Sequence, residues 1–465
     1  MTRVAPLLAL LCTGCFSAHP LEEGESGARL ELIAWAPEDG SGVHATHFFD
    51  RELGVECRFR WDYDADEWRC LPKAHARPIF LDASCREPAA HACATAGESF
   101  VTAGRLEDRT HACGGGGFAV DVSTPARVLD ERVVERAWQL DPSGACVELE
   151  LDDQRVSALE PLPLDMFVRG ELRPRPREGS ERVGRRVIAG EDGSELVLGH
   201  YDHELGAACY VATIADGPLP CVVESVGNAY DSRECGGPWG IVREGPLPPP
   251  PGCEITPPEL FLTTETDDCG LRAAPQIHRA GEPVPQATVE ACIERPTTAT
   301  YVTLVDASDE VAWIDNEPEG TGRIRRFRGR PDVASYVGSR GDFYDQALGV
   351  ECTALDLHGT KRCLPVLARP LGGDPLYADD ACEERVARQH TSTACASFTY
   401  HLQRGAPSAC ADYSDRTYYR VGEAIDVAFE RDEDGACVPV ELRMGERVHR
   451  LEAVPDETFA AFRRI

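Results

Sequence analysis

The stretch Phe49-Asp-Arg-Glu-Leu-Gly-Val-Glu-Cys57 occurs three times, with small changes, in this chain of 465 residues. It returns as Tyr201-Asp-His-Glu-Leu-Gly-Ala-Ala-Cys209 and as Tyr344-Asp-Gln-Ala-Leu-Gly-Val-Glu-Cys352. A motif that recurs at a long, nearly constant spacing indicates an internal repeat. We therefore expect a series of repeat units, each built around one copy.

Further matches follow in the same order. Arg69-Cys-Leu-Pro72 returns as Arg362-Cys-Leu-Pro365, and Pro220-Cys-Val-Val223 is the weaker middle copy. An aromatic residue then precedes the third cysteine of every unit by five positions. We predict three tandem repeat units, which span residues 29–170, 181–312 and 323–465.

The cysteines divide evenly among these units. Two of the 20 cysteines, Cys12 and Cys15, lie near the N-terminus, and the other eighteen fall six to a unit. An even, repeated set in an exported chain predicts disulfides, whereas a zinc site would need closely spaced pairs. We expect bridges within units, from first to second, third to fourth and fifth to sixth cysteine. The disulfide cysteines are Cys57, Cys70, Cys85, Cys93, Cys113, Cys146, Cys209, Cys221, Cys235, Cys253, Cys269, Cys292, Cys352, Cys363, Cys382, Cys395, Cys410 and Cys437.

The segments around the cysteines alternate apolar and polar residues, as in Val55-Glu-Cys-Arg-Phe-Arg-Trp61. Alternation that ends at Asp- and Gly-rich turns predicts β-hairpins. We count about eight short strands per unit and predict an all-β fold. Six four-stranded blades of one β-propeller would use this number of strands. The alternative is three separate small β-domains in a row.

The repeated Asp and Gly have a structural interpretation. A catalytic carboxylate present once in every unit would be unusual, because active sites bring unlike groups together. We interpret Asp50, Asp202 and Asp345 as turn residues that bind nearby backbone amides. The Gly that follows four residues later permits a bulge or a positive φ. A second turn motif, Glu38-Asp-Gly-Ser41, recurs as Glu191-Asp-Gly-Ser194.

We predict no metal, cofactor or catalytic site. Two histidine pairs have a metal-like spacing, but they occupy different positions of the repeat: His44 with His47, and His200 with His203. The turn Asp62-Tyr-Asp-Ala-Asp66 resembles the start of a calcium loop without its Gly and closing Glu. Gly114 to Gly117 lacks the Lys-Ser/Thr of a phosphate loop. The sequence contains no G-x-S-x-G nucleophile motif.

The N-terminus indicates export. A short apolar run ends in Leu11-Cys-Thr-Gly-Cys15, which resembles a bacterial lipobox. We expect residues 1–14 to be a lipoprotein signal peptide, Cys15 to be the lipid attachment site, and residues 15–28 to be a tether. Phe16, in place of Asp, is compatible with sorting to the outer membrane. The expected location is the cell envelope, as an outer-membrane lipoprotein that is periplasmic or surface-exposed.

The charge balance limits the partners. The chain has 47 Lys and Arg residues against 79 Asp and Glu residues, for a net charge of −32. This excess excludes a nucleic-acid partner, which would need a basic surface, and argues against a polybasic lipid-binding surface. We expect contact with the membrane through the lipid anchor, and a neutral or cationic ligand or protein as partner.

The series of repeated motifs, following a lipobox, resembles the cysteine-rich repeat lipoproteins encoded by myxobacteria. The resemblance extends from about residue 29 to the end, and it implies export, anchoring and repetition but no activity. We expect a non-catalytic binding or structural role at the cell envelope. The alternative is an envelope hydrolase that acts on glycans or peptides in a propeller channel.

Overall fold

Nearly every element of the computed structural model is a β-strand, which confirms the all-β prediction. The structure describes residues 24–39, 44–62, 65–109, 118–141, 144–151, 155–177, 180–211, 219–223, 227–230, 239–243, 260–266, 272–285, 287–289, 300–314, 318–320, 322–327, 343–366, 369–370, 375–390, 399–404, 416–432, 435–442 and 446–465. Within these ranges, no helix has the length and apolar character needed to cross a membrane.

The first half of unit one is a four-stranded antiparallel meander. Its strands are β2 (Leu30–Pro37), β3 (His44–Asp50), β4 (Val55–Asp62) and β5 (Glu67–Pro72). The predicted alternation places Cys57 and Phe59 of β4 in the core, where they join Leu30, Phe48 and Cys70. The disulfide between Cys57 and Cys70 links the two strands on this buried face.

Units two and three repeat this meander. The strands of unit two are β15 (Ser180–Gly190), β16 (Glu195–Asp202), β17 (Ala207–Val211) and β18 (Leu219–Val223). Those of unit three are β26 (Ile324–Phe327), β27 (Phe343–Asp345), β28 (Val350–Leu357) and β29 (Thr360–Pro365). The short strand β25 (Pro318–Glu319) pairs with β26, and β1 (Gly24–Glu25) pairs with β16.

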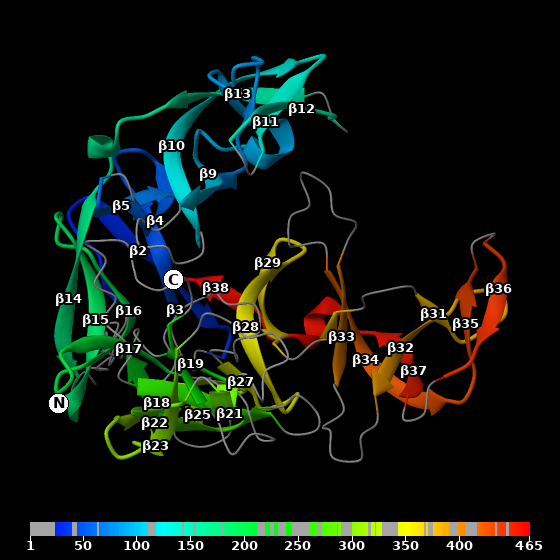
Figure 1. Cartoon of the computed structure of the whole chain (residues 1–465). Helices are drawn as coiled ribbons and strands as arrows, with labels where there is room; N and C mark the ends of the chain where they lie inside the picture. The colour runs from blue at the N-terminus through cyan, green and yellow to red at the C-terminus, as the bar shows by residue number, and fades with distance from the viewer. Residues whose placement is uncertain are drawn as a thin grey trace, which may run out of the picture.

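A return strand at the end of each unit joins its meander. In unit one this is β14 (Arg169–Arg177), which lies between β5 and β15 of unit two. In unit two, β24 (Trp313–Ile314) pairs with β18. In unit three, β38 (Phe462–Arg464) pairs with β2 of unit one, and the preceding residue bridges to β29. Figure 1 shows β38 in red near the blue strands of unit one. The last strand of the chain, β38, thus pairs with the first meander strand of unit one, just as β14 pairs with the first meander strand of unit two.

The residues just before each return strand, here called the return segment (166–168, 310–312 and 458–461), contact the meanders at equivalent places. In all three units, the backbone amide of the second cysteine donates a hydrogen bond to a return-segment carbonyl. These bonds join Cys70 to Val168 (3.0 Å), Cys221 to Ala312 (2.8 Å) and Cys363 to Ala460 (2.9 Å). The repeat seen in the sequence is therefore also a repeat of strand connections.

The second halves of the units form separate sheets. Unit one has an eight-stranded sheet of β6 (His75–Ala76), β7 (Ile79–Phe80), β8 (Pro88–His91), β9 (Phe100–Arg109), β10 (Phe118–Val133), β11 (Ala137–Leu140), β12 (Cys146–Leu149) and β13 (Arg155–Pro161). Unit two has a closed barrel of β19 (Gly227–Tyr230), β20 (Trp239–Arg243), β21 (Leu260–Thr266), β22 (Arg272–Pro283) and β23 (Thr300–Asp306). Unit three has an eight-stranded sheet of β30 (Arg369–Pro370), β31 (Leu376–Tyr377), β32 (Arg385–His390), β33 (Tyr400–Arg404), β34 (Arg416–Ile425), β35 (Ala428–Arg431), β36 (Cys437–Val440) and β37 (Glu446–Ala453).

The strand order in the described part of the chain contains no six-bladed propeller, so this prediction needs correction. Each unit divides into one meander and one separate sheet or barrel, instead of two equivalent blades. This division is closer to the alternative of separate β-domains, although return strands link the meanders. The predicted gaps between units, 171–180 and 313–322, contain paired strands, namely most of β14, β24 and β25. Strand number could not reveal this, because long-range pairing decides which strands share a sheet.

Candidate functional site

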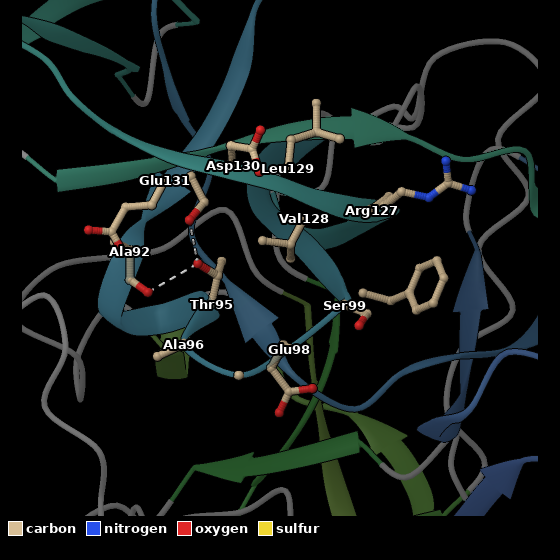
Figure 2. Close-up of a pocket in the computed structure, with 13 residues that line it drawn as sticks. Ala92, Thr95, Ala96, Glu98, Ser99, Arg127, Val128, Leu129, Asp130 and Glu131 are labelled. Atoms are coloured by element: carbon tan, nitrogen blue, oxygen red, sulfur yellow. Dashed lines mark hydrogen bonds between the residues drawn. The ribbon is translucent and has the colours of Figure 1, made fainter.

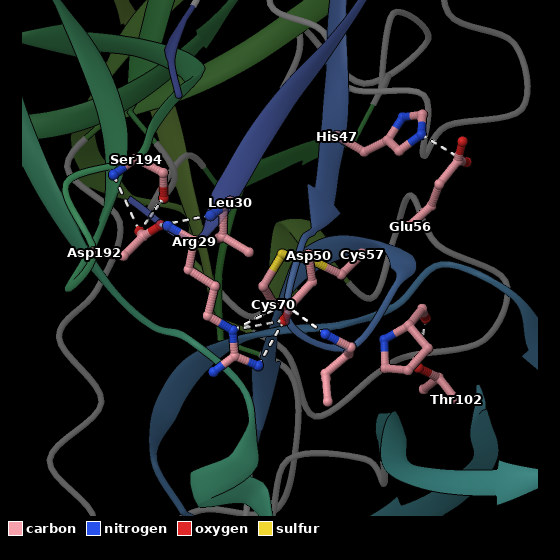
Figure 3. The surroundings of a disulfide bond; sticks show 12 residues. Arg29, Leu30, His47, Asp50, Glu56, Cys57, Cys70, Thr102, Asp192 and Ser194 are labelled. Atoms are coloured by element: carbon pink, nitrogen blue, oxygen red, sulfur yellow. Dashed lines mark hydrogen bonds and ion pairs between the residues drawn. A yellow bond between two sulfur atoms is a disulfide. The ribbon is translucent and has the colours of Figure 1, made fainter. Parts of the chain in front are cut away.

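The repeated Asp is a fully buried partner of an arginine. In unit one, Asp50 accepts hydrogen bonds from Nε (2.9 Å) and Nη2 (2.7 Å) of Arg29. It also accepts bonds from the backbone amides of Glu52 (3.0 Å) and Leu53 (3.1 Å). Figure 3 shows Arg29 and Asp50 beside the Cys57–Cys70 disulfide. The turn interpretation of Asp50 is therefore confirmed, and the ion pair is an additional finding.

The same pair recurs in the other units. Asp202 binds Arg182 and Asp345 binds Arg323, and each carboxylate also accepts hydrogen bonds from the backbone amides two and three residues later in the chain. Each arginine also donates to a carbonyl of the return segment: Arg29 to Met166 (2.7 Å), Arg182 to Glu310 (2.5 Å) and Arg323 to Thr458 (2.6 Å). Hydrogen bonding to Asp raises the pKa of Arg29 and Arg323. These polar residues hold the first strand, the turn and the return segment together.

Sequence reasoning missed these arginines. They precede the repeated Asp by 21, 20 and 22 residues, and each is followed by Leu, Val or Ile. Alignment of the three units backwards from the Asp would have found them.

The second turn motif connects neighbouring units. Asp192 of unit two accepts bonds from the backbone amides of Arg29 (3.1 Å) and Leu30 (2.7 Å) of unit one, as Figure 3 shows. Asp39 of unit one accepts a bond from the amide of Ile324 of unit three (3.1 Å). The repeated Glu-Asp-Gly-Ser sequence is thus a contact between meanders.

The repeated Gly adopts the left-handed conformation in all three units. The φ angles are +69° at Gly54, +64° at Gly206 and +68° at Gly349, which confirms the predicted positive φ. A side chain is unfavourable in this region, which explains the glycine in all three units.

The disulfides confirm one predicted pairing and correct another. First-to-second bridges are present in every unit, at Cys57–Cys70, Cys209–Cys221 and Cys352–Cys363. The third cysteine, however, pairs with the sixth, at Cys85–Cys146 and Cys382–Cys437. The predicted third-to-fourth and fifth-to-sixth bridges are therefore wrong in units one and three. The reason is that β11 pairs with β7, and β35 with β31, which brings the last cysteine to the turn that holds the third.

Other predicted positions lie outside the described residues. These are Cys15, Asp64, Gly114 to Gly117, and seven further cysteines: Cys113, Cys235, Cys253, Cys269, Cys292, Cys395 and Cys410. The side chain of Cys93 also lies outside, although its backbone belongs to the turn η1 (Ala92–Thr95).

The paired histidines have separate environments. His44 packs against Phe343 of unit three at 5.3 Å between ring centres, and His203 lies at the same distance from Tyr201. Within the described ranges, no group of three or more His, Cys, Asp or Glu side chains could hold a metal ion. Asp62 accepts a hydrogen bond from the amide of Ala65 (2.8 Å), which is an ordinary turn contact.

His47 belongs to a polar network near the end of the chain. Its Nδ1 lies 2.5 Å from the Thr46 hydroxyl, and its Nε2 lies 2.9 Å from the Glu56 carboxylate. Lys73 (3.0 Å) and Arg464 of β38 (3.3 Å) also contact Glu56. Burial lowers the pKa of His47. The pKa of Glu56 is lowered to about 2, mainly by its hydrogen bond with His47 and to a smaller extent by its hydrogen bond with Lys73. Glu56 therefore connects unit one to the last strand.

A pocket of about 820 Å³ lies in the second half of unit one, between η1 and β10 (Figure 2). The buried Thr95 hydroxyl lies 2.9 Å from the Ser157 hydroxyl and 3.1 Å from the Ala92 carbonyl. Three carboxylates line the pocket, those of Glu98, Asp130 and Glu131. The one lining arginine, Arg127, is paired with Glu160 at 3.1 Å. The volume is in the range of small-molecule sites, and the lining favours a neutral or cationic group.

A β-bulge shapes this pocket, and the bulge recurs in all units. The register shift in β10 leaves Leu129 and Asp130 opposite a single residue of β13, Ala158. Equivalent shifts leave Gly281 and Glu282 opposite Thr303 in unit two, and Gly422 and Glu423 opposite Arg450 in unit three. Bulges redirect side chains and often lie beside binding sites. An acidic residue thus occupies the same bulge position three times.

Comparison with known proteins identifies a family but no function. A family model described as a family of unknown function (DUF7481) matches residues 7–459. No curated protein matches the chain, and no solved structure does.

Proposed function

We propose that this chain, which belongs to the family of unknown function DUF7481, is an exported, lipid-anchored protein with a non-catalytic binding or structural role at the cell envelope. The main supporting observation is that the repeated Asp residues are buried and form ion pairs within the fold. Asp50, Asp202 and Asp345 are completely buried and paired with arginines that hold each meander to its return segment. The repeated Asp–Arg pairs thus stabilise the fold of each unit.

The disulfides support export. Five cysteine pairs are bonded in the described residues, and such bridges persist in oxidising compartments outside the cytosol. The 61-residue separation of Cys85 and Cys146 corresponds to a stabilisation of about 4 kcal/mol by restriction of the unfolded chain.

Lipidation at Cys15 would hold the folded protein close to the bilayer. Gly24, the first described residue, is already paired with β16. Gly24 lies nine positions after Cys15, and a chain of this length spans at most about 30 Å. Phe16, which follows Cys15, is compatible with sorting to the outer membrane, and the resemblance to myxobacterial lipoproteins supports export and anchoring.

The anchor is tested by fractionation. Cys15→Ser is expected to move the protein into the soluble fraction, whereas Cys12→Ser, the matched control in the same segment, should leave it in the membrane pellet. A Cys15→Ser protein that stays in the pellet would show that the lipobox interpretation is wrong.

The binding role is supported by the acidic pocket of unit one and by the net charge of −32. We expect a neutral or cationic ligand or protein partner. The soluble Cys15→Ser protein should be screened on glycan and peptide arrays. Turnover of a bound substrate, lost when a pocket carboxylate such as Glu131 is replaced, would instead favour the hydrolase alternative.

A further inference from the structure

Unit three holds an arginine side chain between two carboxylates on the surface of its second sheet. Nε of Arg450, in β37, lies 3.2 Å from the Glu423 carboxylate, and Nη1 of the same guanidinium contacts Glu384. The hydrogen bond with Glu384 raises the pKa of Arg450. Two different nitrogens of one guanidinium therefore bind two carboxylates from different segments.

Unit one has alanine in place of this arginine. Arg450 pairs with Val386 of β32 and lies opposite the bulge of β34. In unit one, Ala158 pairs with Ala89 of β8 and lies opposite the bulge of β10. Ala158 and Arg450 thus have the same pairing with both neighbouring strands, so Ala158 is the equivalent of Arg450. The methyl side chain of Ala158 supplies no positive charge.

Unit one nevertheless keeps both carboxylates. Asp130 occupies the same bulge position as Glu423. Glu87 matches Glu384, because each lies two residues after the third cysteine and accepts an equivalent backbone hydrogen bond, from Leu81 or from Ala378. Both Glu87 and Asp130 are exposed, and neither has an ion-pair partner within the part of the chain that the structure describes.

We propose that Glu87 and Asp130 form a binding site for the guanidinium group of an arginine side chain in a cationic partner protein or peptide. This inference rests on the proposed binding role and specifies its partner. Two exposed carboxylates alone would indicate no ligand, but the equivalent pair in unit three already binds an arginine. The ligand arginine takes the place that Ala158 leaves, and the net charge of −32 attracts a cationic partner.

The chemistry favours arginine over lysine. A guanidinium presents several donors in a planar fork and can bind two carboxylates at once, whereas an ammonium acts as a point charge. In unit three, the two carboxylates contact Nε and Nη1, which are separate positions of this fork. The site is therefore expected to prefer an arginine peptide to a lysine peptide of equal charge.

The test measures binding of short, fluorescein-labelled arginine and lysine peptides of equal length to the soluble Cys15→Ser protein by fluorescence anisotropy. The variant Glu87→Gln/Asp130→Asn should bind the arginine peptide about fivefold more weakly, as expected for two exposed ion pairs. It should also lose the preference for arginine. Glu135→Gln/Glu150→Gln removes the same charge from exposed positions in the same unit and should have little effect.

Two further variants test the equivalence of the units. Ala158→Arg should rebuild the arrangement of unit three within unit one and lower arginine-peptide affinity as the double variant does. Arg450→Ala should expose the second carboxylate pair and raise peptide binding.

The outcomes separate this inference from the proposed function. Equal losses in the double variant and its control would show attraction by bulk charge alone and would overturn the site. A protein that binds no arginine peptide would also overturn it, even if the arrays identify another ligand. Arrays without any ligand would contradict the binding role itself.

Discussion

Asp50→Ala tests whether the repeated buried ion pair supports the architecture. The Asp50 side chain is 0% exposed, and the Arg29 side chain is 18% exposed. The substitution removes the carboxylate that Arg29 binds and the acceptor for the amides of Glu52 and Leu53. Arg29 keeps the Met166 carbonyl and an exposed contact with Glu52 at 3.2 Å.

The expected loss of stability is about 3 kcal/mol. Removing one partner of a buried ion pair costs about 3–5 kcal/mol, and the remaining contacts of Arg29 favour the lower limit. Asp50→Asn should cost less, about 2 kcal/mol, because the amide oxygen can still accept the turn hydrogen bonds. The matched control is Glu160→Gln, which breaks an exposed pair with Arg127 and should cost less than about 1 kcal/mol.

Urea unfolding of the soluble Cys15→Ser protein measures these losses. Three of the six tryptophans, Trp35, Trp61 and Trp68, lie in the meander of unit one, so half of the tryptophans that contribute to the fluorescence report on this region. Several units need not unfold together, and the first transition is therefore compared between variants. The double variant Arg29→Ala/Asp50→Ala should be less destabilised than the sum of the single variants. An Asp50→Ala protein as stable as Glu160→Gln would refute the structural role of the buried pair.

Three more predictions concern the cysteines, the acid stability and the last strand. Non-reducing peptide mapping should link Cys85 to Cys146, and a link from Cys85 to the fourth cysteine of the unit would contradict this pairing. The pKa of Glu56 is about 2, below its ordinary value of 4.5, so its stabilisation is complete above about pH 4.5 and is lost as the pH falls toward 2. Because Glu56 is partly exposed to solvent, we take its contribution to the free energy of unfolding as about 1–2 kcal/mol. The stability difference between wild type and Glu56→Gln should therefore disappear near pH 2. A difference that stays constant with pH would contradict this role of Glu56. Deletion of residues 462–465 removes β38 and should accelerate hydrogen exchange of the β2 amides, with which β38 pairs. The β37 amides serve as the control and should exchange as before. Unchanged exchange in β2 would show that β38 does not protect this strand.

Local features could be predicted from the sequence because neighbouring residues determine them. Cys57 and Cys70 are 13 residues apart across one hairpin, so their strands and their bridge follow from alternation and turn residues. Gly54 has a positive φ because the turn after Asp50 requires it, and any copy of the motif carries the same constraint. The structural interpretation of the repeated Asp was available for the same reason.

The carboxylate pair of unit one could not be recognised from the sequence. Glu87 could be matched to Glu384 by its position two residues after the third cysteine, but only the registers of β10 with β13 and of β34 with β37 relate Asp130 to Glu423. The pocket likewise depends on a bulge whose position appears only when β10 is paired with β13.

The sequence by itself determined the all-β class, the three repeat units and the first disulfide of each unit, because periodicity, turn residues and short spacings act within a few strands. The tertiary structure decided how the strands are grouped, which cysteine meets Cys85, and how the chain end contacts unit one. These features depend on pairing between segments as distant as Ala36 and Arg463, where many alternative pairings have the same local pattern. Only the packing of all strands together selects one of them.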